Sequence, residues 1–292
     1  MYLFDYLQNT PVAFYISMAV FGLIVGSFLN VVIHRLPKML EIDWQQQCRT
    51  LLNPDTPERA PAEDFSLTTP RSQCPQCGHK ISVMENIPVI SYLILRGKCS
   101  ACRQPIAIRY PVIELTSGML AVFSAWHYGF GAHALLALLL AWSLLTLSVI
   151  DLDHQLLPDD ITLPFLWLGL LVNMYGVFTD LHSSLIGAVA GYGVLWTVYM
   201  SFKLLTGKEG MGYGDFKLLA MLGAWLGWQM LPLIILLSSV TGAIIGIGLI
   251  LLKLHDKSKP IPFGPYLALA GWIALVWGHD LNSIYLHWGA GH

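Results

Sequence analysis

The chain has 292 residues, of which 55% are hydrophobic and only 12% charged, and its mean hydropathy is +0.60. This composition excludes an ordinary soluble domain and predicts a polytopic membrane protein that lies in a lipid bilayer. The formal net charge of −2 gives no reason to expect a nucleic-acid partner.

The first apolar segment covers residues 11–33. It carries no charged residue and is long enough to span a membrane. Residues 1–10 contain no Lys or Arg, whereas a secretory signal peptide begins with basic residues. We therefore expect residues 11–33 to be retained as the first transmembrane helix.

A polar region follows at residues 34–110 and holds ten of the sixteen Lys and Arg residues, together with all five cysteines. Within it, residues 39–70 are rich in Pro, Asp, Glu and Gln and show little periodicity, so we expect a loop-like insertion there. The region as a whole predicts a small polar domain inserted after the first membrane helix.

This region contains two CxxC pairs, formed by Cys74, Cys77, Cys99 and Cys102. Four thiolates in two such pairs are typical of a structural zinc site, which is closed and holds a fold together without activating water. Two disulfides or a redox pair are the alternatives, and a reducing compartment disfavours them. His79 is either a replacement ligand or a surface residue, and Cys48 is expected to be a spare thiol.

Seven further membrane helices are expected after residue 110. Their predicted bounds are 111–128, 132–150, 161–178, 183–203, 217–229, 231–252 and 261–278. One helix over the uncharged run 218–252 would be about 52 Å long, against a bilayer core of about 30 Å, so two helices are required there. Pro232 is the predicted turn. The chain is thus predicted to be an all-α membrane protein with about eight transmembrane helices.

The basic residues predict the orientation of these helices. If residues 34–110 are cytosolic, the other inside loops are 151–160, 204–216 and 253–260. Every Lys and Arg then lies inside or at the inner edge of a span. This is the positive-inside pattern. It predicts that Asp151 and Asp215 face the same side, the cytosol.

Asp151 and Asp215 each stand at the end of an uncharged run, and Asp215 closes the sequence Gly-Tyr-Gly-Asp. Acids at the ends of membrane helices are functional candidates, and two of them on one side suffice for acid–base hydrolysis. Asp153 and Asp159 compete with Asp151 for the first role. Because the segment after Asp215 is short, we expect this acid slightly below the membrane surface. The alternative is that the acids only cap helices.

Two other functions remain open at this level. In an acid-dependent transporter, carboxylates would lie along a central path, whereas these acids lie at one membrane face and the chain shows no obvious inverted repeat. In a zinc-stapled assembly scaffold, the acids would be only structural.

The motifs of the chain, taken together and in order, form a specific set. They are Gly26-Ser-Phe-Leu-Asn-Val-Val-Ile-His-Arg-Leu-Pro37, both CxxC pairs, Asn86-Ile-Pro88, Ser91-Tyr92, Leu95-Arg-Gly-Lys-Cys99, Arg109-Tyr-Pro111, Ile150-Asp-Leu-Asp-His-Gln-Leu-Leu-Pro-Asp159, Gly212-Tyr-Gly-Asp215 and Pro262-Phe-Gly-Pro265. This set resembles the prepilin peptidases of type IV pilus and type II secretion systems. These are bifunctional leader peptidase/N-methyltransferases and GxGD membrane aspartyl proteases. The resemblance covers nearly the whole chain except residues 39–70.

The resemblance implies an endopeptidase of the bacterial inner membrane whose active site faces the cytosol. Its substrates would be prepilins or pseudopilins, each with a short basic leader and a hydrophobic helix, cleaved between Gly and a residue that is usually Phe. The new N-terminal amine would then be methylated with S-adenosylmethionine. Asp151 and Asp215 match the catalytic positions, and the four paired cysteines match the zinc ligands. Gly97 matches a glycine linked to methylation, although a turn before Cys99 also explains it.

We therefore expect three parts. These are the first transmembrane helix at 1–33, a cytosolic zinc-binding and methyltransferase-associated domain at 34–110, and a seven-helix membrane aspartyl protease domain at 111–292. No GxGxxG motif marks a nucleotide site.

Four polar residues near the membrane segments carry smaller predictions. Glu114 is expected to pair with Arg109. Asn30 is expected to form a hydrogen bond across helices. Lys217 either acts on the neighbouring Asp215 or anchors its helix at the lipid headgroups.

Overall fold

The computed structural model describes residues 2–52, 65–252 and 261–289, and the chain divides into two compact units, Met1–Leu138 and Leu139–His292. We call them unit 1 and unit 2. Within the described residues the regular structure is helical, apart from two single β-bridges, Gln73 with Lys80 and Lys98 with Pro105. The predicted all-α class is confirmed.

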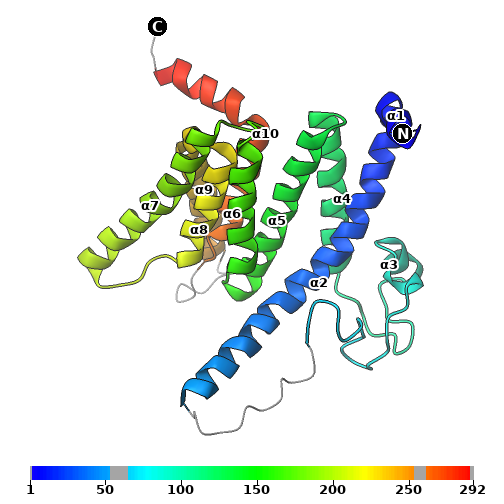
Figure 1. The fold of residues 1–292 in the computed structure, drawn as a ribbon. Helices are drawn as coiled ribbons and strands as arrows, with labels where there is room; N and C mark the ends of the chain where they lie inside the picture. Colours follow the sequence, from blue (N-terminus) through cyan, green and yellow to red (C-terminus); the bar gives the residue numbers. More distant parts are fainter. Residues whose placement is uncertain (1, 53–64, 253–260, 290–292) are drawn as a thin grey trace. The chain divides into compact units, whose positions relative to one another are not determined.

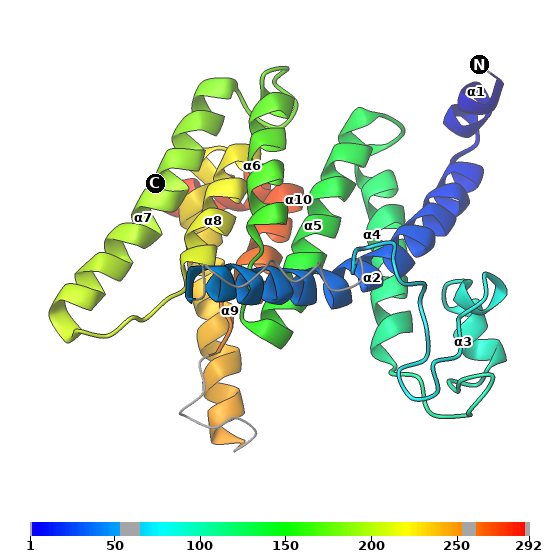
Figure 2. The ribbon, with the colours of Figure 1, turned by 60° about the horizontal axis from the view of Figure 1, so that its bottom comes forward.

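Unit 1 is built on two helices that lie side by side, α2 (Pro11–Leu52) and α4 (Arg109–Tyr128) (Figures 1 and 2). The short helix α1 (Tyr2–Asn9) precedes them. Between α2 and α4 the chain forms two cysteine-bearing hairpins, closed by the bridges Gln73–Lys80 and Lys98–Pro105. The turn η1 (Met84–Asn86) and the short helix α3 (Ile90–Ile94) lie between these hairpins. One unit thus combines an apolar helix pair with the polar, cysteine-rich segment.

Small residues let α2 and α4 approach each other closely. A Cβ on Gly22 or Gly26 would lie 2.6 Å or 2.8 Å from the nearest atoms of α4. The Ser117 hydroxyl donates to the Gly22 carbonyl at 2.6 Å across the same contact. The interhelical hydrogen bond predicted for Asn30 is confirmed, since its Nδ2 donates to the Tyr110 carbonyl at 3.1 Å. Close approach at a small-xxx-small spacing is a common way for membrane helices to pack.

The helix α2 is longer than predicted. It runs without a break to Leu52, so the loop predicted at residues 39–70 is wrong over its first part. This exposed stretch is polar, but its side chains pair along the helix, as in the 2.8 Å hydrogen bond from Gln47 to Asp43. Residues 53–64 of the predicted loop lie outside the described residues. The helix also crosses the boundary predicted at residue 33, and the division into three domains stays a prediction.

Unit 2 contains most of α5 and all the helices that follow it in the chain. Their bounds are Ala132–His154 (α5), Asp159–Asn173 (α6), Leu181–Thr206 (α7), Tyr213–Leu226 (α8), Trp228–Met230 (η2), Leu231–Leu251 (α9) and Gly264–Gly289 (α10). Each membrane segment predicted after residue 110 coincides with one of the helices α4 to α10. The turn predicted at Pro232 is wrong. The chain turns at Gly227, where φ is +83°, and Pro232 lies in the first turn of α9, where its missing N–H is no loss.

Helix α8 packs against α6, α7 and α10 and is almost wholly buried (Figures 1 and 2). Its last carbonyl groups are bound by neighbouring helices. Asn173 donates to Ala224 and Trp225 at 2.8 and 2.9 Å, and Ser184 also donates to Ala224. Such donors satisfy the carbonyl groups that a helix end leaves free. The far end of α8 is thereby held, which fixes where its first turn and Asp215 lie.

Four of the described helices are long and apolar enough to cross a membrane, namely α2, α5, α7 and the stretch Trp228–Leu251. Large apolar side chains on α7 and α9 point outward, for example Val189 and Ile244, which are 75% and 65% exposed. Such surfaces suit lipid and not water. The chain is therefore a membrane protein, while the number of eight spans stays a prediction.

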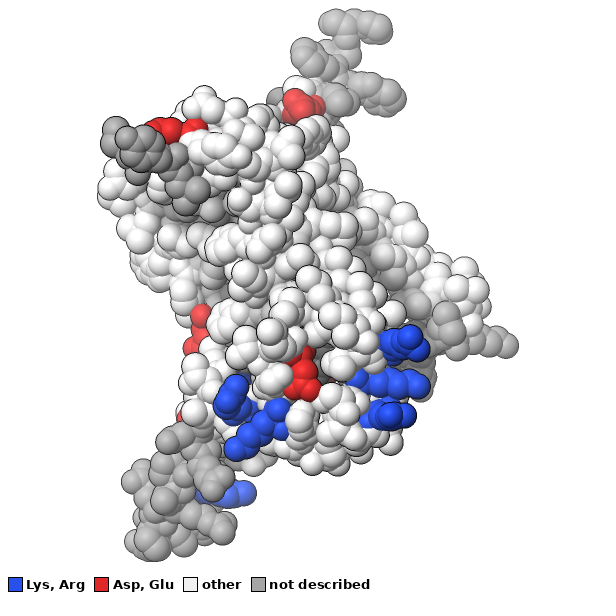
Figure 3. All heavy atoms as spheres, turned by 90° about the vertical axis from the view of Figure 1, so that its right-hand side faces the viewer, with Lys and Arg blue, Asp and Glu red and all other residues white. Residues whose placement is uncertain are grey.

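On the face shown in Figure 3, Lys and Arg side chains gather at one end, with acidic side chains among them.

Candidate functional site

Asp151 lies in the last turn of α5 and is only 6% exposed. Its Oδ2 accepts a hydrogen bond from the backbone N–H of Gly264 at 2.9 Å, and Gly264 is the first residue of α10. The N–H groups and the dipole at a helix N-terminus favour a negative charge. The carboxylate is thus held between the end of one helix and the start of another.

Glycines in two motifs make room around this carboxylate. A Cβ on Gly264 would lie 2.6 Å from Oδ2 of Asp151 and 3.2 Å from a methyl group of Leu157. A Cβ on Gly214 would lie 2.8 Å from Cβ of the same leucine. The Leu157 side chain therefore contacts both the start of α10 and the Gly-Tyr-Gly-Asp motif at the start of α8. Only residues without a side chain allow this approach.

Asp215 lies in the first turn of α8 and is 7% exposed. Its backbone N–H donates to the Gly212 carbonyl at 3.3 Å, and its carboxylate lies near enough to Asp151 for the two charges to repel each other. Unit 2 thus brings together the two acids that the sequence predicted to face the same side.

The competing acids lie outside this buried pair. Asp153 and Asp159 are both exposed. Both carboxylate oxygens of Asp159 accept hydrogen bonds from Nζ of Lys217 at 2.7 Å, which ties the start of α6 to α8. Lys217 therefore pairs with Asp159, which neither predicted role for this lysine included. Burial and proximity favour Asp151 as the partner of Asp215.

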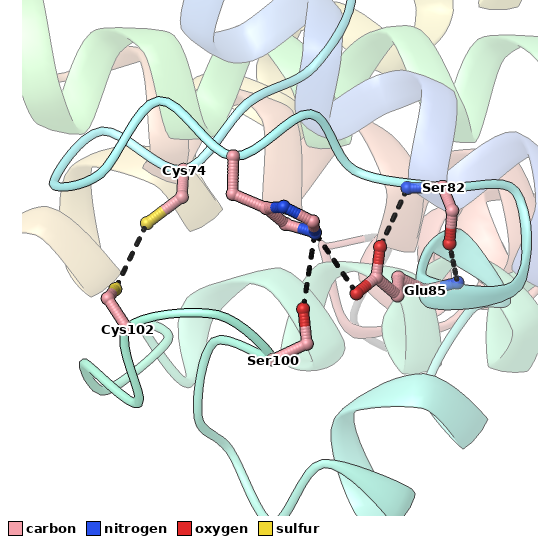
Figure 4. Close-up of polar contacts among 6 residues, drawn as sticks. Cys74, Ser82, Glu85, Ser100 and Cys102 are labelled. Carbon is pink, nitrogen blue, oxygen red and sulfur yellow. Dashed lines mark hydrogen bonds and ion pairs between the residues drawn. The ribbon is translucent and has the colours of Figure 1, made fainter.

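The four paired cysteines converge in unit 1. Their Sγ atoms all lie within 4.8 Å of one another, and those of Cys74 and Cys102 are 3.8 Å apart (Figure 4). All four are free thiols, since a disulfide needs sulfur atoms about 2.05 Å apart. Sulfur atoms around a tetrahedral zinc ion, each at about 2.3 Å from the metal, are about 3.8 Å apart. The group can therefore hold one metal ion.

Both pairs lie in the same kind of turn. The Gly78 N–H donates to the Cys74 carbonyl at 2.9 Å, and the Arg103 N–H donates to the Cys99 carbonyl at 3.0 Å. Gly78 and Arg103 both have a positive φ, +69° and +58°. The backbone N–H groups of Cys77 and the residue before it lower the pKa of the Cys74 thiol to about 7. Backbone N–H groups likewise lower the pKa of the Cys99 thiol, whereas burial and the neighbouring thiols raise that of Cys102 to about 11. The turns therefore favour the thiolate, the form that binds a metal, at the first cysteine of each pair.

His79 links the two hairpins. Its Nε2 lies 3.3 Å from the Ser100 hydroxyl and 3.4 Å from Oε1 of Glu85. Glu85 also accepts a hydrogen bond from the Ser82 N–H at 2.8 Å (Figure 4). The Ser100 hydroxyl and this N–H lower the pKa of the Glu85 carboxyl to about 2. His79 therefore stabilises the arrangement around the cysteines and is not part of the four-sulfur group.

Gly97 has φ +67°, and a Cβ there would lie 2.9 Å from the hydroxyl oxygen of Tyr92. Both the backbone and the packing therefore favour glycine. Glu114 is 9% exposed, and its Oε2 accepts a hydrogen bond from the Val89 N–H at 2.8 Å. The pairing of Glu114 with Arg109 stays a prediction.

Comparison with known proteins decides between the functions that the sequence left open. A family model described as Bacterial Peptidase A24 N-terminal domain matches residues 20–128, and one described as Type IV leader peptidase family matches residues 138–247. The prepilin leader peptidase/N-methyltransferases of Stutzerimonas stutzeri and Pseudomonas aeruginosa are each 56% identical to this chain over 97% of both chains. That of Dichelobacter nodosus is 46% identical over 96% of both chains. The chain belongs to the prepilin leader peptidase/N-methyltransferase family. No solved structure matches it.

Gly264 is a residue of the candidate site for which the sequence predicted no role. The signal was present in Pro262-Phe-Gly-Pro265, because a proline at the first position after Gly264 is typical of a helix start. Nothing in the sequence shows which acid that helix start faces. The contact with Asp151 joins residues 113 positions apart, so only the folded chain reveals it.

Proposed function

We propose that this chain removes the basic leader from prepilins or pseudopilins and then methylates the new N-terminal amine. Close relatives that match almost its whole length are named for both activities. The observation that carries the peptidase half is the buried pair of Asp151 and Asp215 in unit 2. Exposed acids that only cap helices would have no need to share such a site.

The acid pair supplies both proton transfers of amide hydrolysis. One carboxylate takes a proton from water as the water oxygen attacks the scissile carbonyl carbon, and the protonated partner stabilises the developing charge on the carbonyl oxygen. A proton then passes to the leaving amine as the C–N bond breaks. The two acids titrate as one unit. The Gly264 N–H takes up one acceptor site on Oδ2 of Asp151, which leaves the other acceptor sites of this carboxylate for water.

The membrane location of the enzyme indicates how its substrate would be oriented. We expect its hydrophobic helix to lie in the bilayer and its basic leader to stay in the cytosol, since the positive-inside rule applies to both proteins. The distribution of Lys and Arg in this chain supports a site at the cytosolic face of the bacterial inner membrane. Cleavage between Gly and a Phe-type residue is expected from the family resemblance.

We assign zinc to the four-cysteine centre. An all-thiolate set at this sulfur spacing fits tetrahedral zinc, which when bound supplies a cross-link and no open coordination position. The ligands would be Cys74, Cys77, Cys99 and Cys102. The chain's own contribution is the pair of matched turns that point the sulfur atoms toward one another.

In the methyltransferase half, S-adenosylmethionine supplies an electrophilic methyl group carried on a sulfonium. The chain must bind this donor, hold the substrate amine nearby and exclude water. Gly97 stays our candidate here, as a positioning residue. A side chain at this point would displace the Tyr92 hydroxyl and strain the turn that leads to Cys99.

Cleavage of a purified prepilin by the full chain in detergent tests the peptidase half. We expect Asp151→Asn and Asp215→Asn each to lower kcat/KM by about 10²–10⁴-fold or more, the usual contribution of acid–base groups. Both variants should fold, because an Asn oxygen at position 151 can still accept from the Gly264 N–H. Asp153→Asn is the matched control and should cleave at the wild-type rate. Retained cleavage by either Asn variant would contradict the assignment.

A further inference from the structure

Unit 1 contains a cavity of about 610 Å³ next to the four-cysteine centre. Its walls come from α2, α4 and both hairpins and include Cys74, Cys99, Tyr92 and Glu114. The volume falls within the range of about 300–1,000 Å³ that is typical of sites for small molecules. The acid chemistry proposed for unit 2 makes no use of this cavity.

The cavity walls combine three kinds of chemical group. Tyr92 and Tyr110 offer aromatic rings, and Glu114 offers a carboxylate. His34 and Lys38 offer basic nitrogens, which lie 3.0 Å apart. A flat base stacks on an aromatic ring, a cation pairs with a carboxylate, and a carboxylate pairs with a basic side chain. A nucleoside that carries an amino acid and a second positive charge uses all three.

Glu114 is the most informative of these residues because it is more than nine-tenths buried. The partners that the structure describes for its carboxylate, the Val89 N–H and the Ser27 side chain, are both neutral. A buried carboxylate with only neutral partners is costly to keep ionised, and an approaching cation offsets that cost. A positively charged ligand in the cavity would supply that cation.

The backbone that binds Glu114 is strained. Val89 has φ +59° and ψ −46°, a conformation that β-branched residues rarely adopt. The next N–H, that of Ile90, donates back to the Pro88 carbonyl and closes a tight γ-turn. Strained backbone persists where surrounding contacts hold it, and it is concentrated at ligand sites. Here it directs the Val89 N–H at the carboxylate.

A second hollow, of about 520 Å³, lies in unit 2 between α7 and the start of α9. Its walls are apolar residues such as Ile186, Val194 and Leu231, with Ser239 as a polar exception, and none of them is charged. This hollow suits hydrocarbon and cannot balance a charged ligand. Of these two hollows, only the cavity of unit 1 offers a carboxylate to a cationic ligand, and basic side chains such as Arg35 and Lys38 that could bind the ligand's own carboxylate.

We propose that the cavity of unit 1 binds S-adenosylmethionine, with the Glu114 carboxylate opposite the sulfonium and the Tyr92 ring against the adenine. This inference deepens the proposed methyltransferase activity and rests on it. During transfer, a C–N bond forms to the substrate amine and the C–S bond breaks, while the amine releases a proton to solvent. The sulfonium becomes a neutral thioether. Glu114 therefore attracts the donor more strongly than the product S-adenosylhomocysteine.

The test measures binding directly, by isothermal titration of the full chain in detergent with S-adenosylmethionine and with S-adenosylhomocysteine. We expect Glu114→Gln to weaken binding of the charged donor at least about tenfold and binding of the neutral product less than about twofold. The substitution keeps an oxygen for the Val89 N–H. Tyr92→Ala should weaken the binding of both ligands. Glu41→Gln, on the exposed part of α2, is the matched control and should bind both ligands normally.

The possible results separate this inference from the proposed function. Normal donor binding by both Glu114→Gln and Tyr92→Ala would overturn the proposal that the cavity binds the donor. Methylation by the wild type would still support the proposed function. Equal loss of donor and product in Glu114→Gln overturns the sulfonium contact. A wild-type chain that cleaves prepilin but binds no donor overturns both the cavity and the methyltransferase half. Prepilin cleavage by each variant shows that it is folded.

Discussion

Asp151 keeps its position through a backbone hydrogen bond that Gly264 can donate only because it has no side chain. A carboxylate that performs acid–base chemistry must be held within a fraction of an ångström of its working position. The start of α10 provides that restraint, and Leu157 supports it from the chain between α5 and α6. We therefore infer that Gly264 is a positioning residue for the acid pair.

We expect Gly264→Ala to lower kcat for prepilin cleavage by about 10²-fold, the usual cost of misplacing a reacting group by about 1 Å. The added Cβ would lie 2.6 Å from Oδ2 of Asp151, so the carboxylate or α10 must move. Gly248→Ala on α9 is the matched control, because nothing lies within 4 Å of its Cβ position. Kinetics with saturating prepilin and thermal unfolding should be measured together. Equal kcat values for the two variants would contradict the positioning role of Gly264.

Single residues also show where prediction from the sequence stops. Asp151 and Asp215 could be predicted, because acids at the ends of uncharged runs are rare and the basic residues orient the helices. The partners of Glu114 and Lys217 could not be predicted, because both pair with residues far away in the sequence. For Lys217 the sequence neighbour Asp215 was suggested instead, while the pairing suggested for Glu114 with Arg109 stays a prediction. A polar side chain near a helix end takes whichever partner the fold brings near.

Among the elements, the membrane helices were the most predictable, because long uncharged runs have few alternatives in a bilayer. The extension of α2 to Leu52 was missed because its polar composition resembles that of a loop. The pairing of side chains four residues apart makes the same composition compatible with a helix. The turn after α8 was misplaced by a few residues, because a proline can start a helix as well as end one.

We expect the two hairpins of unit 1 to depend on the zinc ion that we assign to them. We expect about one zinc ion per purified chain by mass spectrometry, and Cys99→Ser should lose most of it, because a ligand is removed from a closed tetrahedral site. Cys48→Ser is the matched control, since Cys48 is exposed and lies outside the four-sulfur group. A Cys99→Ser protein with the same zinc content as the control would show that the cysteines do not hold the ion.

At the scale of the whole molecule, we propose that the chain carries its two activities in its two compact units. The acid pair lies wholly within unit 2, and the four cysteines and the polar cavity lie wholly within unit 1. The described residues of each site come from a single unit. We therefore expect the peptidase and donor-binding functions to be separable by substitution, as the variants at Asp151 and Glu114 are designed to show.

The central claim is that Asp151 and Asp215 act as one unit on one peptide bond. The most direct measurement is kcat/KM for prepilin cleavage by Asp151→Asn, Asp215→Asn and the double variant. Groups that work together are strongly non-additive, so the double variant should lose about as much activity as either single variant. Losses that multiply in the double variant, as expected of two independent residues, would contradict the claim.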